Sequence, residues 1–390
     1  MRIRRHISPF QYALLIAASY MGFGIFQFPR ELVQRAGPDA LWALAAELLW
    51  ALAAFRLWIA VNRLHPDQPV FGFAASYLPR PVVTAMVAIT VILHLGLAFI
   101  ALANFGFLMR TYFLPETPLF AIDAAFVLTA VYVAWYDIAP LARTLETVFL
   151  VPGLLSIFIG ILLIGRMRFG YALLPSTHLW LLPTVRATYH GAYMFFGFEV
   201  TMVLYPLVRQ EQQRIAERYA FWAMIFTFAF FLFGYAMVLG VEGPFFLTHI
   251  QWPTVSANRL VDIEGLFVNK LGLLVVVLWG LMLLAFLTLR LWCVIHDAIP
   301  DYGVHSLPRY RILLVIAAAL VVAAALQIPN IAPLDVIIQR FMIPAMLGYL
   351  FLTPAVVWTA AFLVHRHRWD PHPPTPRPRA SLGRPSRRLL

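Results

Sequence analysis

Apolar stretches long enough to cross a membrane follow one another along almost the whole chain, separated by short polar segments. A transmembrane helix needs about 20 mostly apolar residues, and this requirement predicts a series of ten spans. The predicted spans run near residues 9–35, 40–62, 81–112, 118–137, 140–165, 183–207, 217–241, 266–296, 310–328 and 335–364. The pattern therefore predicts an all-α polytopic membrane domain over residues 1–364.

The composition supports a membrane protein over a soluble one. Hydrophobic residues make up 62% and charged residues 12% of the 390 residues, and the mean hydropathy is +0.80. The net charge of +11 comes largely from basic residues between the spans and in the C-terminal tail. This placement is typical of proteins held in a lipid membrane, so a nucleic-acid partner is not expected. The single cysteine, Cys293, excludes an internal disulfide.

Both chain termini are predicted to lie on the same side of the membrane, because the number of spans is even. The segments on that side carry more Lys and Arg than the segments on the opposite side, which predicts that both termini are cytoplasmic. The tail, residues 365–390, is rich in Pro and Arg and has little apolar surface to bury. We expect this tail to be disordered and attracted to anionic lipid.

Two of the predicted spans carry glycine near their centres. The first span contains "ASYMGFGIFQFP" and the sixth contains "GAYMFFGFEVTMVLYP", so both place Tyr-Met before a Gly/Phe cluster and reach a proline later. The two spans occupy corresponding positions if the chain divides into two halves of five spans each, near residues 9–165 and 183–364. Because five is an odd number, the second half crosses the membrane in the opposite direction to the first. That is the pattern of transporters in which paired discontinuous helices form a substrate site near mid-membrane. The alternative is that the glycines only allow close helix packing.

Broken helices at these positions offer groups that suit an amino-acid ligand. The first amides of an outer half-helix that starts near Ile25 have no intrahelical acceptor and attract a carboxylate. Carbonyls freed near Gly197 accept from an ammonium group, and Glu199 adds a negative charge beside them. The alternative for Glu199 is a structural acid bonded to exposed amides or to a neighbouring helix. The candidate substrate-binding residues are Gly22, Phe23, Gly24, Ile25, Phe196, Gly197, Phe198, Glu199 and Trp279.

Three further ionisable residues are candidates for coupling. Arg143 and Glu146 lie three residues apart on one face of the fifth span, where we expect an ion pair, with a proton relay as the alternative. His94 lies near the middle of the third span and is a candidate because a histidine can change charge in the physiological range, but a hydrogen-bonded packing histidine is the favoured interpretation. Arg56 is expected to snorkel toward the cytoplasmic side. We find no nucleophile–base constellation, phosphate loop or metal cluster, so neither enzymatic activity nor a cofactor nor a metal is expected.

Short motifs along the chain resemble those of a known family. The motifs are "GIFQFPRELVQRAGPDA", "YFLPETPL", "LARTLETVFLVP", "FFGFEV", "WPT", the "LW" of the eighth span and "QIPNI". Their order resembles the spore-germination permeases, which are the membrane B subunits of nutrient germinant receptors in the amino acid–polyamine–organocation superfamily. The resemblance covers about residues 7–364.

This resemblance implies a ten-helix, LeuT-like fold of five plus five inverted helices, with helices 1 and 6 discontinuous. It also implies a small nutrient as ligand, an amino acid being expected, and the A and C subunits of the receptor as protein partners. The expected location is the spore inner membrane or the cell membrane. The expected function is nutrient binding at mid-membrane and signalling of germination. The alternatives are a proton-coupled amino-acid transporter and a water or ion pathway of the same fold.

The predicted topology can be tested with single cysteines at Gln68 and Gln251, because these residues fall in loops on opposite sides of the ten-span arrangement. A membrane-impermeant thiol reagent is expected to label only one of them in intact cells. Labelling of both from the same side would contradict the ten-span arrangement.

Overall fold

The computed structural model describes residues 6–22, 27–136, 138–172, 181–259, 271–299 and 307–367. Helices account for nearly all of the regular structure in these ranges, and one isolated parallel bridge joins Ile7 to Val208. The tail was expected to be disordered over residues 365–390, but its first three residues belong to α17, which ends at His367. Residues 368–390 lie outside the described residues, as do Phe23, Gly24 and Ile25.

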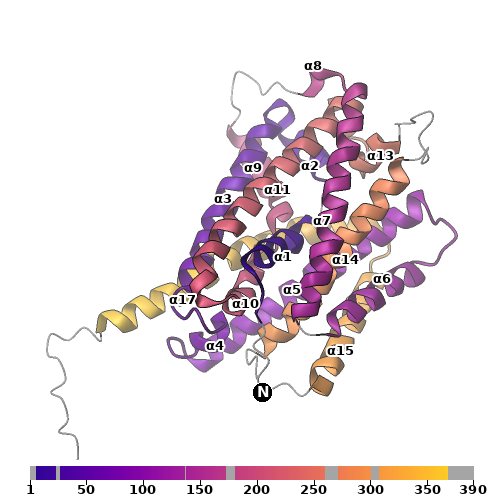
Figure 1. The fold of residues 1–390 in the computed structure, drawn as a ribbon. Coiled ribbons are helices and arrows are strands. Elements are labelled where there is room, and N and C mark those ends of the chain that lie inside the picture. Colours follow the sequence, from indigo (N-terminus) through magenta and orange to yellow (C-terminus); the bar gives the residue numbers. More distant parts are fainter. Residues whose placement is uncertain are drawn as a thin grey trace, which may run out of the picture.

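Long helices form the body of the molecule (Figure 1). They are α3 (Ala40–Asn62), α5 (Arg80–Tyr112), α7 (Ile138–Leu163), α11 (Gln213–Glu242), α14 (Leu271–Ala298), α15 (Leu307–Leu326) and α17 (Ile343–His367). Shorter helices are α1 (Pro9–Met21), α2 (Phe28–Ala36), α6 (Leu119–Ala134), α9 (Leu181–Gly191), α10 (Thr201–Leu204) and α16 (Ile331–Ile337). Small helices at the ends of the bundle are α4 (Val70–Ala74), α8 (Phe169–Ala172), α12 (Pro244–Leu247) and α13 (Pro253–Arg259).

Single turns of other helix types complete the chain. The 3-10 turns are η1 (Gly37–Asp39), η2 (Ile164–Arg166), η3 (Ala192–Phe195), η4 (Phe198–Val200), η5 (Tyr205–Leu207) and η6 (Gln210–Gln212). A π-helical turn, η7 (Ile338–Met342), joins α16 to α17.

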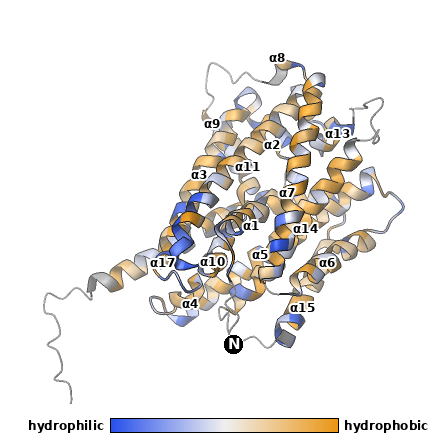
Figure 2. Ribbon diagram, viewed as in Figure 1, coloured by the Kyte–Doolittle hydropathy of each residue, from blue (hydrophilic) through white to orange (hydrophobic). Residues whose placement is uncertain are grey.

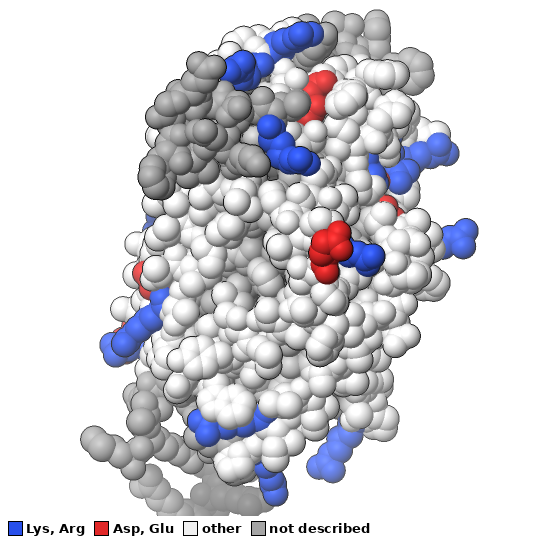
Figure 3. Space-filling view, turned by 90° about the vertical axis from the view of Figure 1, so that its right-hand side faces the viewer, with Lys and Arg blue, Asp and Glu red and all other residues white. Residues whose placement is uncertain are grey.

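The described part of the chain contains seven helices that are long and apolar enough to cross a membrane. They overlap the predicted spans two, three, five, seven, eight, nine and ten, and they identify the protein as a multi-pass integral membrane protein. Helices within the first, fourth and sixth predicted spans are shorter, so the total of ten stays a prediction. Orange, hydrophobic colour covers most of the long helices in Figure 2, and the face shown in Figure 3 is largely uncharged.

The first and sixth predicted spans are discontinuous, as the sequence predicted. Helix α1 begins after a capping box formed by Ser8 and Gln11 and ends at Met21, and a separate helix, α2, begins at Phe28. In the sixth span, α9 and η3 are followed by an extended residue, Phe196, and a new helical turn starts at Phe198. Between them, Gly197 has a φ of 150°, a conformation that favours glycine.

The glycine at the first break also allows close helix packing. A Cβ atom added to Gly22 would lie 2.6 Å from the Cβ atom of Phe286 and 3.0 Å from the carbonyl oxygen of Met282, both on α14. Helix α1 contacts α7, α11 and α14 and lies in the middle of the bundle (Figure 1). Gly22 therefore serves close helix packing, the alternative considered from the sequence, and also lies at the end of α1.

The two ends of the bundle carry different loops. In Figure 1 the N-terminus and α4 lie at one end, whereas α8 and α13 lie at the other. This arrangement agrees with the predicted placement of the loop around residues 63–80 and of the loop before α13 at opposite ends. In the segment before α13, the side chain of Trp252 is only 4% exposed and packs inward against Tyr112.

Gly197→Ala is expected to destabilise the fold by about 1–3 kcal/mol through backbone strain alone. The added Cβ atom would also meet the carbonyl oxygen of Ser19 and lie 2.6 Å from Nη2 of Arg290. The matched control is Gly348→Ala in α17, where the nearest atom would be Leu352 Cδ1 at 3.9 Å. Thermal unfolding in detergent checks the pair, and an equal effect of both changes would contradict this account of the break.

Candidate functional site

Arg290 on α14 ties the two broken segments together. Its side chain is completely buried, and its Nη1 atom donates to Oε1 of Glu199 over 2.5 Å. Its Nη2 atom donates over 2.8 Å to the carbonyl oxygen of Ser19, in the last turns of α1. A single guanidinium group therefore bridges the end of α1 and the helical turn that follows Gly197.

His94 and Asp297 complete this group, which we call the Arg290 cluster (Ser19, His94, Glu199, Arg290 and Asp297). The Nδ1 atom of His94, from α5, lies 3.0 Å from Nη1 of Arg290. Because a guanidinium group only donates, Nδ1 accepts and the ring proton sits on Nε2. That Nε2 atom faces Oδ2 of Asp297 at 3.5 Å. All four side chains in this chain of contacts are buried.

Two atoms of the central ion pair are left without hydrogen-bond partners. Within the described residues, Nε of Arg290 and Oε2 of Glu199 are buried and have no hydrogen-bond partner. A buried ion pair is stabilised only when additional hydrogen bonds satisfy both partners, and an unmet donor or acceptor carries a desolvation cost. The pair thus offers one donor and one acceptor to a further group.

Trp279, also on α14, forms a hydrogen bond with a further backbone carbonyl at the first break, that of Gly22. Its indole Nε1 donates to the carbonyl oxygen of Gly22 over 3.2 Å, and its ring lies 5.0 Å from that of Phe105. Phe196 and Phe198 are fully buried and meet Trp50 and Phe55 edge-on, so both act as packing residues around the second break. The ligand role predicted for these two residues stays a prediction.

Several predicted site residues meet in space, and others do not. Gly22, His94, Gly197, Glu199 and Trp279 come from four separate segments and gather around α14. The carbonyl oxygen of Gly197 itself accepts from the amide of Val200 over 3.2 Å, and the ligand role expected for carbonyls near Gly197 stays a prediction. For Glu199 the structure shows the alternative contact, a bond to a neighbouring helix.

The ion pair predicted between Arg143 and Glu146 is not formed, although both residues lie within the described part of the chain. Arg143 is exposed, and Oε2 of Glu146 accepts a hydrogen bond from Nε2 of Gln11 over 3.2 Å. The spacing of Arg143 and Glu146 places both on one face of α7, but the partner of Glu146 is Gln11 from α1.

Sequence reasoning missed Arg290, Asp297 and Ser19. Arg290 had a clear signal, because it is an isolated charge inside a strongly apolar helix, and such residues usually mark functional positions. Asp297 lies in the last turn of the same helix, where a charged residue is expected simply because the span ends there. The contact of Ser19 uses a backbone carbonyl, which no residue type reveals.

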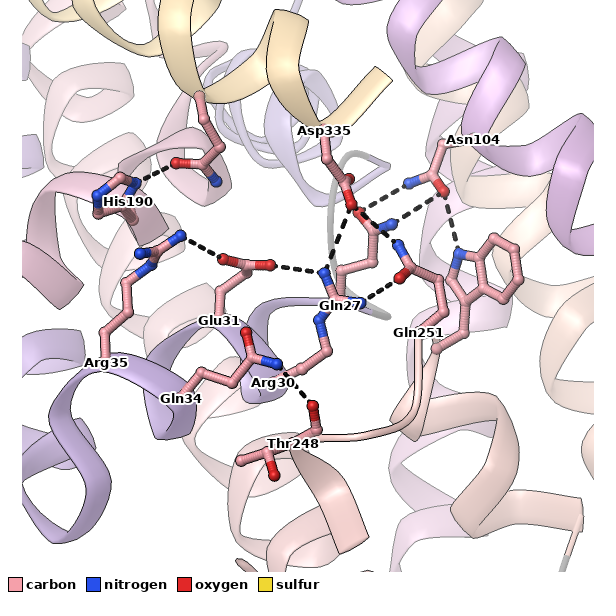
Figure 4. Close-up of polar contacts among 12 residues, drawn as sticks. Gln27, Arg30, Glu31, Gln34, Arg35, Asn104, His190, Thr248, Gln251 and Asp335 are labelled. Atoms are coloured by element: carbon pink, nitrogen blue, oxygen red, sulfur yellow. Dashed lines mark hydrogen bonds and ion pairs between the residues drawn. The ribbon is translucent and has the colours of Figure 1, made fainter. Parts of the chain in front are cut away.

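A polar network covers the side of the breaks that carries α13 (Figure 4). Arg30 on α2 contacts Glu31 at 2.8 Å and Asp335 of α16 at 3.5 Å, and it also donates to Gln251. Gln251 in turn donates to Oδ2 of Asp335 over 3.4 Å, and Arg35 contacts Glu31 at 3.2 Å. These contacts join the half-helix after the first break to the segment before α13 and to α16.

The amide group of Gln27 extends this network toward the first break. Gln27 and Asn104 exchange hydrogen bonds of 3.3 and 3.2 Å, and Asn104 also accepts from the indole of Trp252 over 3.0 Å. Because Gln27 immediately precedes α2, the start of this half-helix is tied to α5. Any movement of α2 therefore has to exchange these partners.

A second polar network lies on the opposite side of the breaks. Tyr12 on α1 bonds to Thr201 on α10, and Tyr205 donates to Oε1 of Glu217 over 2.8 Å. Arg63, which follows α3, makes a two-pronged ion pair with Glu217, and this contact raises the pKa of Arg63 above its ordinary value. The half-helices α1 and α10 are thus tied to each other and, through Tyr205, to α11.

The fold and these two breaks define a class, a multi-pass membrane protein with a LeuT-like transporter fold. A crystal structure of the Eremococcus coleocola manganese transporter with an aromatic bis-isothiourea substituted compound is 14% identical, with a TM-score of 0.50, covering 91% of this chain and 76% of that chain. A single-site mutant of that transporter is 13% identical, with a TM-score of 0.51, covering 90% and 77%. At this identity the likeness concerns the fold alone.

The family follows from the sequence. The profile of the family described as "Spore germination protein" matches residues 6–332, and the chain belongs to that family. Spore germination protein A2 of Bacillus subtilis (strain 168) is 21% identical over 282 residues, which cover 70% of this chain and 74% of that protein. These matches confirm the resemblance inferred from the ordered motifs.

The importance of the buried ion pair can be measured with a double-mutant cycle. Arg290→Gln leaves Glu199 buried without its cation, and is expected to cost about 3–5 kcal/mol of stability. Glu199→Gln combined with Arg290→Gln is expected to cost about 0.5–3 kcal/mol less than the sum of the single changes. The control is Arg143→Gln on the surface, expected to stay within about 0.5 kcal/mol. Strictly additive effects in thermal or denaturant unfolding would show that the pair is not coupled.

Proposed function

We propose that this protein is the membrane subunit of a nutrient germinant receptor and that it recognises a small amino acid between the two broken helices. Family membership and the transporter-like fold support a role in germination or transport. The observation that carries the ligand proposal is the Glu199–Arg290 pair, buried where the two breaks meet. The proposed setting is the spore inner membrane, with both termini cytoplasmic and the receptor's A and C subunits as partners.

The unfilled positions of this pair suit a zwitterion. The ammonium group of an amino acid can donate to Oε2 of Glu199, and its carboxylate can accept from Nε of Arg290. Each charge of the ligand then faces an opposite charge, so the ion pair stays balanced during binding. A simple amine or a simple carboxylate would add one uncompensated charge to a buried site, which costs several kcal/mol.

Signalling would follow from the ties around the breaks. A ligand shifts a conformational equilibrium only through different affinities for the two states. Ser19 lies on α1 and Glu199 on the turn before α10, and the second polar network joins these segments through Tyr12 and Thr201. A ligand that repositions Arg290 therefore changes how α1 and α10 are held, and the partner subunits would receive that change.

A second candidate function is proton-coupled transport of the same ligand. Glu47 on α3 is fully buried, and neither of its carboxylate oxygens has a hydrogen-bond partner among the described residues. Ionisable groups at such depth commonly belong to proton relays. Uptake of a labelled amino acid by proteoliposomes that contain only this chain would favour the transporter.

The ligand proposal is tested by thermal-shift titration of purified protein with amino acids, and with the matched amines and carboxylates that lack one charge. An amino acid at 100 times its dissociation constant is expected to add about 2.7 kcal/mol of stability, and the matched singly charged compounds much less. Glu199→Gln is expected to weaken the response to the amino acid.

Glu116→Gln, a change at an exposed loop residue, is the matched control and is expected to leave the response intact. The proposal fails if uncharged compounds stabilise the protein and no amino acid does. It also fails if Glu199→Gln and the control respond alike while both variants remain folded.

A further inference from the structure

A groove between the ends of α3 and α11 lies beside the second polar network, and the ligand recognition proposed above makes no use of its exposed arginines. It measures about 440 Å³. We call it the α3–α11 groove. It is lined by Phe55, Arg56, Ile59, Arg63, Glu217, Arg218, Phe221 and Trp222. The lower end of α11, where the groove lies, has hydrophilic colour in Figure 2.

The groove carries an excess of positive charge. Arg56, Arg63 and Arg218 face a single acid, Glu217, whose carboxylate is already engaged by Arg63 and Tyr205. Arg56 and Arg218 are exposed, and no carboxylate in the described part of the chain forms an ion pair with either. Two guanidinium groups are therefore available to an anion.

The apolar side of the groove indicates where that anion comes from. Trp222 is 63% exposed, and Phe226 and Ile215 on the same helix are also exposed. Tryptophan is favoured where the hydrocarbon core meets the polar head groups. The guanidinium group of Arg56 lies 5.5 Å from the centre of the Phe221 ring, so cation and aromatic surface stand side by side.

We propose that the α3–α11 groove binds the phosphate-bearing head group of an anionic membrane lipid. The phosphate meets Arg56 and Arg218, because guanidinium groups pair with phosphate through paired N–H donors. The glycerol and the first acyl carbons lie against Trp222 and the exposed apolar side chains that follow it along α11. A basic pocket between membrane helices is suited to such lipids.

The bound lipid would sit next to one of the ties described above. Glu217 forms the inner wall of the groove, and its Oε1 atom accepts from both Arg63 and Tyr205. Tyr205 lies on the segment that follows the second break. The groove therefore places a lipid phosphate within reach of the Arg63–Glu217–Tyr205 contact.

Native mass spectrometry of the detergent-solubilised full chain tests the proposal with two probes, phosphatidylglycerol and phosphatidylcholine. The wild-type protein is expected to retain phosphatidylglycerol preferentially. Each of Arg56→Gln and Arg218→Gln is expected to weaken this binding about five-fold, and the double change about 25-fold, at roughly 1 kcal/mol per arginine. Arg56→Lys and Arg218→Lys keep the charge but lose the paired N–H donors, and are expected to restore only part of the binding.

Arg80→Gln, at an exposed position that begins α5, is the matched control and is expected to leave lipid binding unchanged. Equal retention of the two lipids by the wild-type protein would overturn the proposal, as would an equal loss in the control. Glycerol 3-phosphate separates the sources of phosphate, and binding of this soluble probe as tight as that of the lipid would also overturn it. Because no nutrient is needed, these outcomes do not depend on the proposed receptor function.

Discussion

The structure depends on one buried ion pair, between Arg290 and Glu199, at the place where two helices are interrupted. An interrupted helix in lipid leaves backbone groups without partners, and water is not there to replace them. Arg290 meets this requirement for Ser19, while its charge is balanced by Glu199 from the other interrupted segment. The same side chain thus compensates one break and fastens it to the second, which explains why a fully buried arginine is tolerated.

The pair also determines how the surrounding networks are arranged. On one side Arg30 joins the half-helix α2 to α16, and on the other side Tyr205 and Arg63 meet on Glu217. Both networks combine charged and uncharged polar groups, and Arg30 and Glu217 each contact more than one partner, whereas the helices around them pack through apolar side chains. Rearrangement therefore requires the least free energy at the two networks and at the breaks, and the most within the apolar contacts between them.

The sequence predicted the features that depend on local chemistry. Glycine near the centre of an apolar span predicted the breaks, and the positive φ of Gly197 shows the backbone reason for that choice. Features that depend on distant partners could not be predicted. Glu146 pairs with Gln11 instead of its helical neighbour Arg143, because α1 passes beside α7 in the folded chain. The inward position of Trp252 likewise depends on an acceptor, Asn104, that lies 148 residues away.

The proposed recognition of a zwitterion and the stability of the fold make opposite demands on the same residues. Full satisfaction of Arg290 and Glu199 by the protein would give the most stable buried pair, but it would leave no group for a ligand. In the described structure, one donor nitrogen and one acceptor oxygen of this pair stay without partners, at a cost in desolvation. His94 and the carbonyl of Ser19 reduce that cost without occupying these two atoms. The cluster thus joins two helix breaks while one donor and one acceptor stay open, which is the arrangement that the proposed zwitterionic ligand requires.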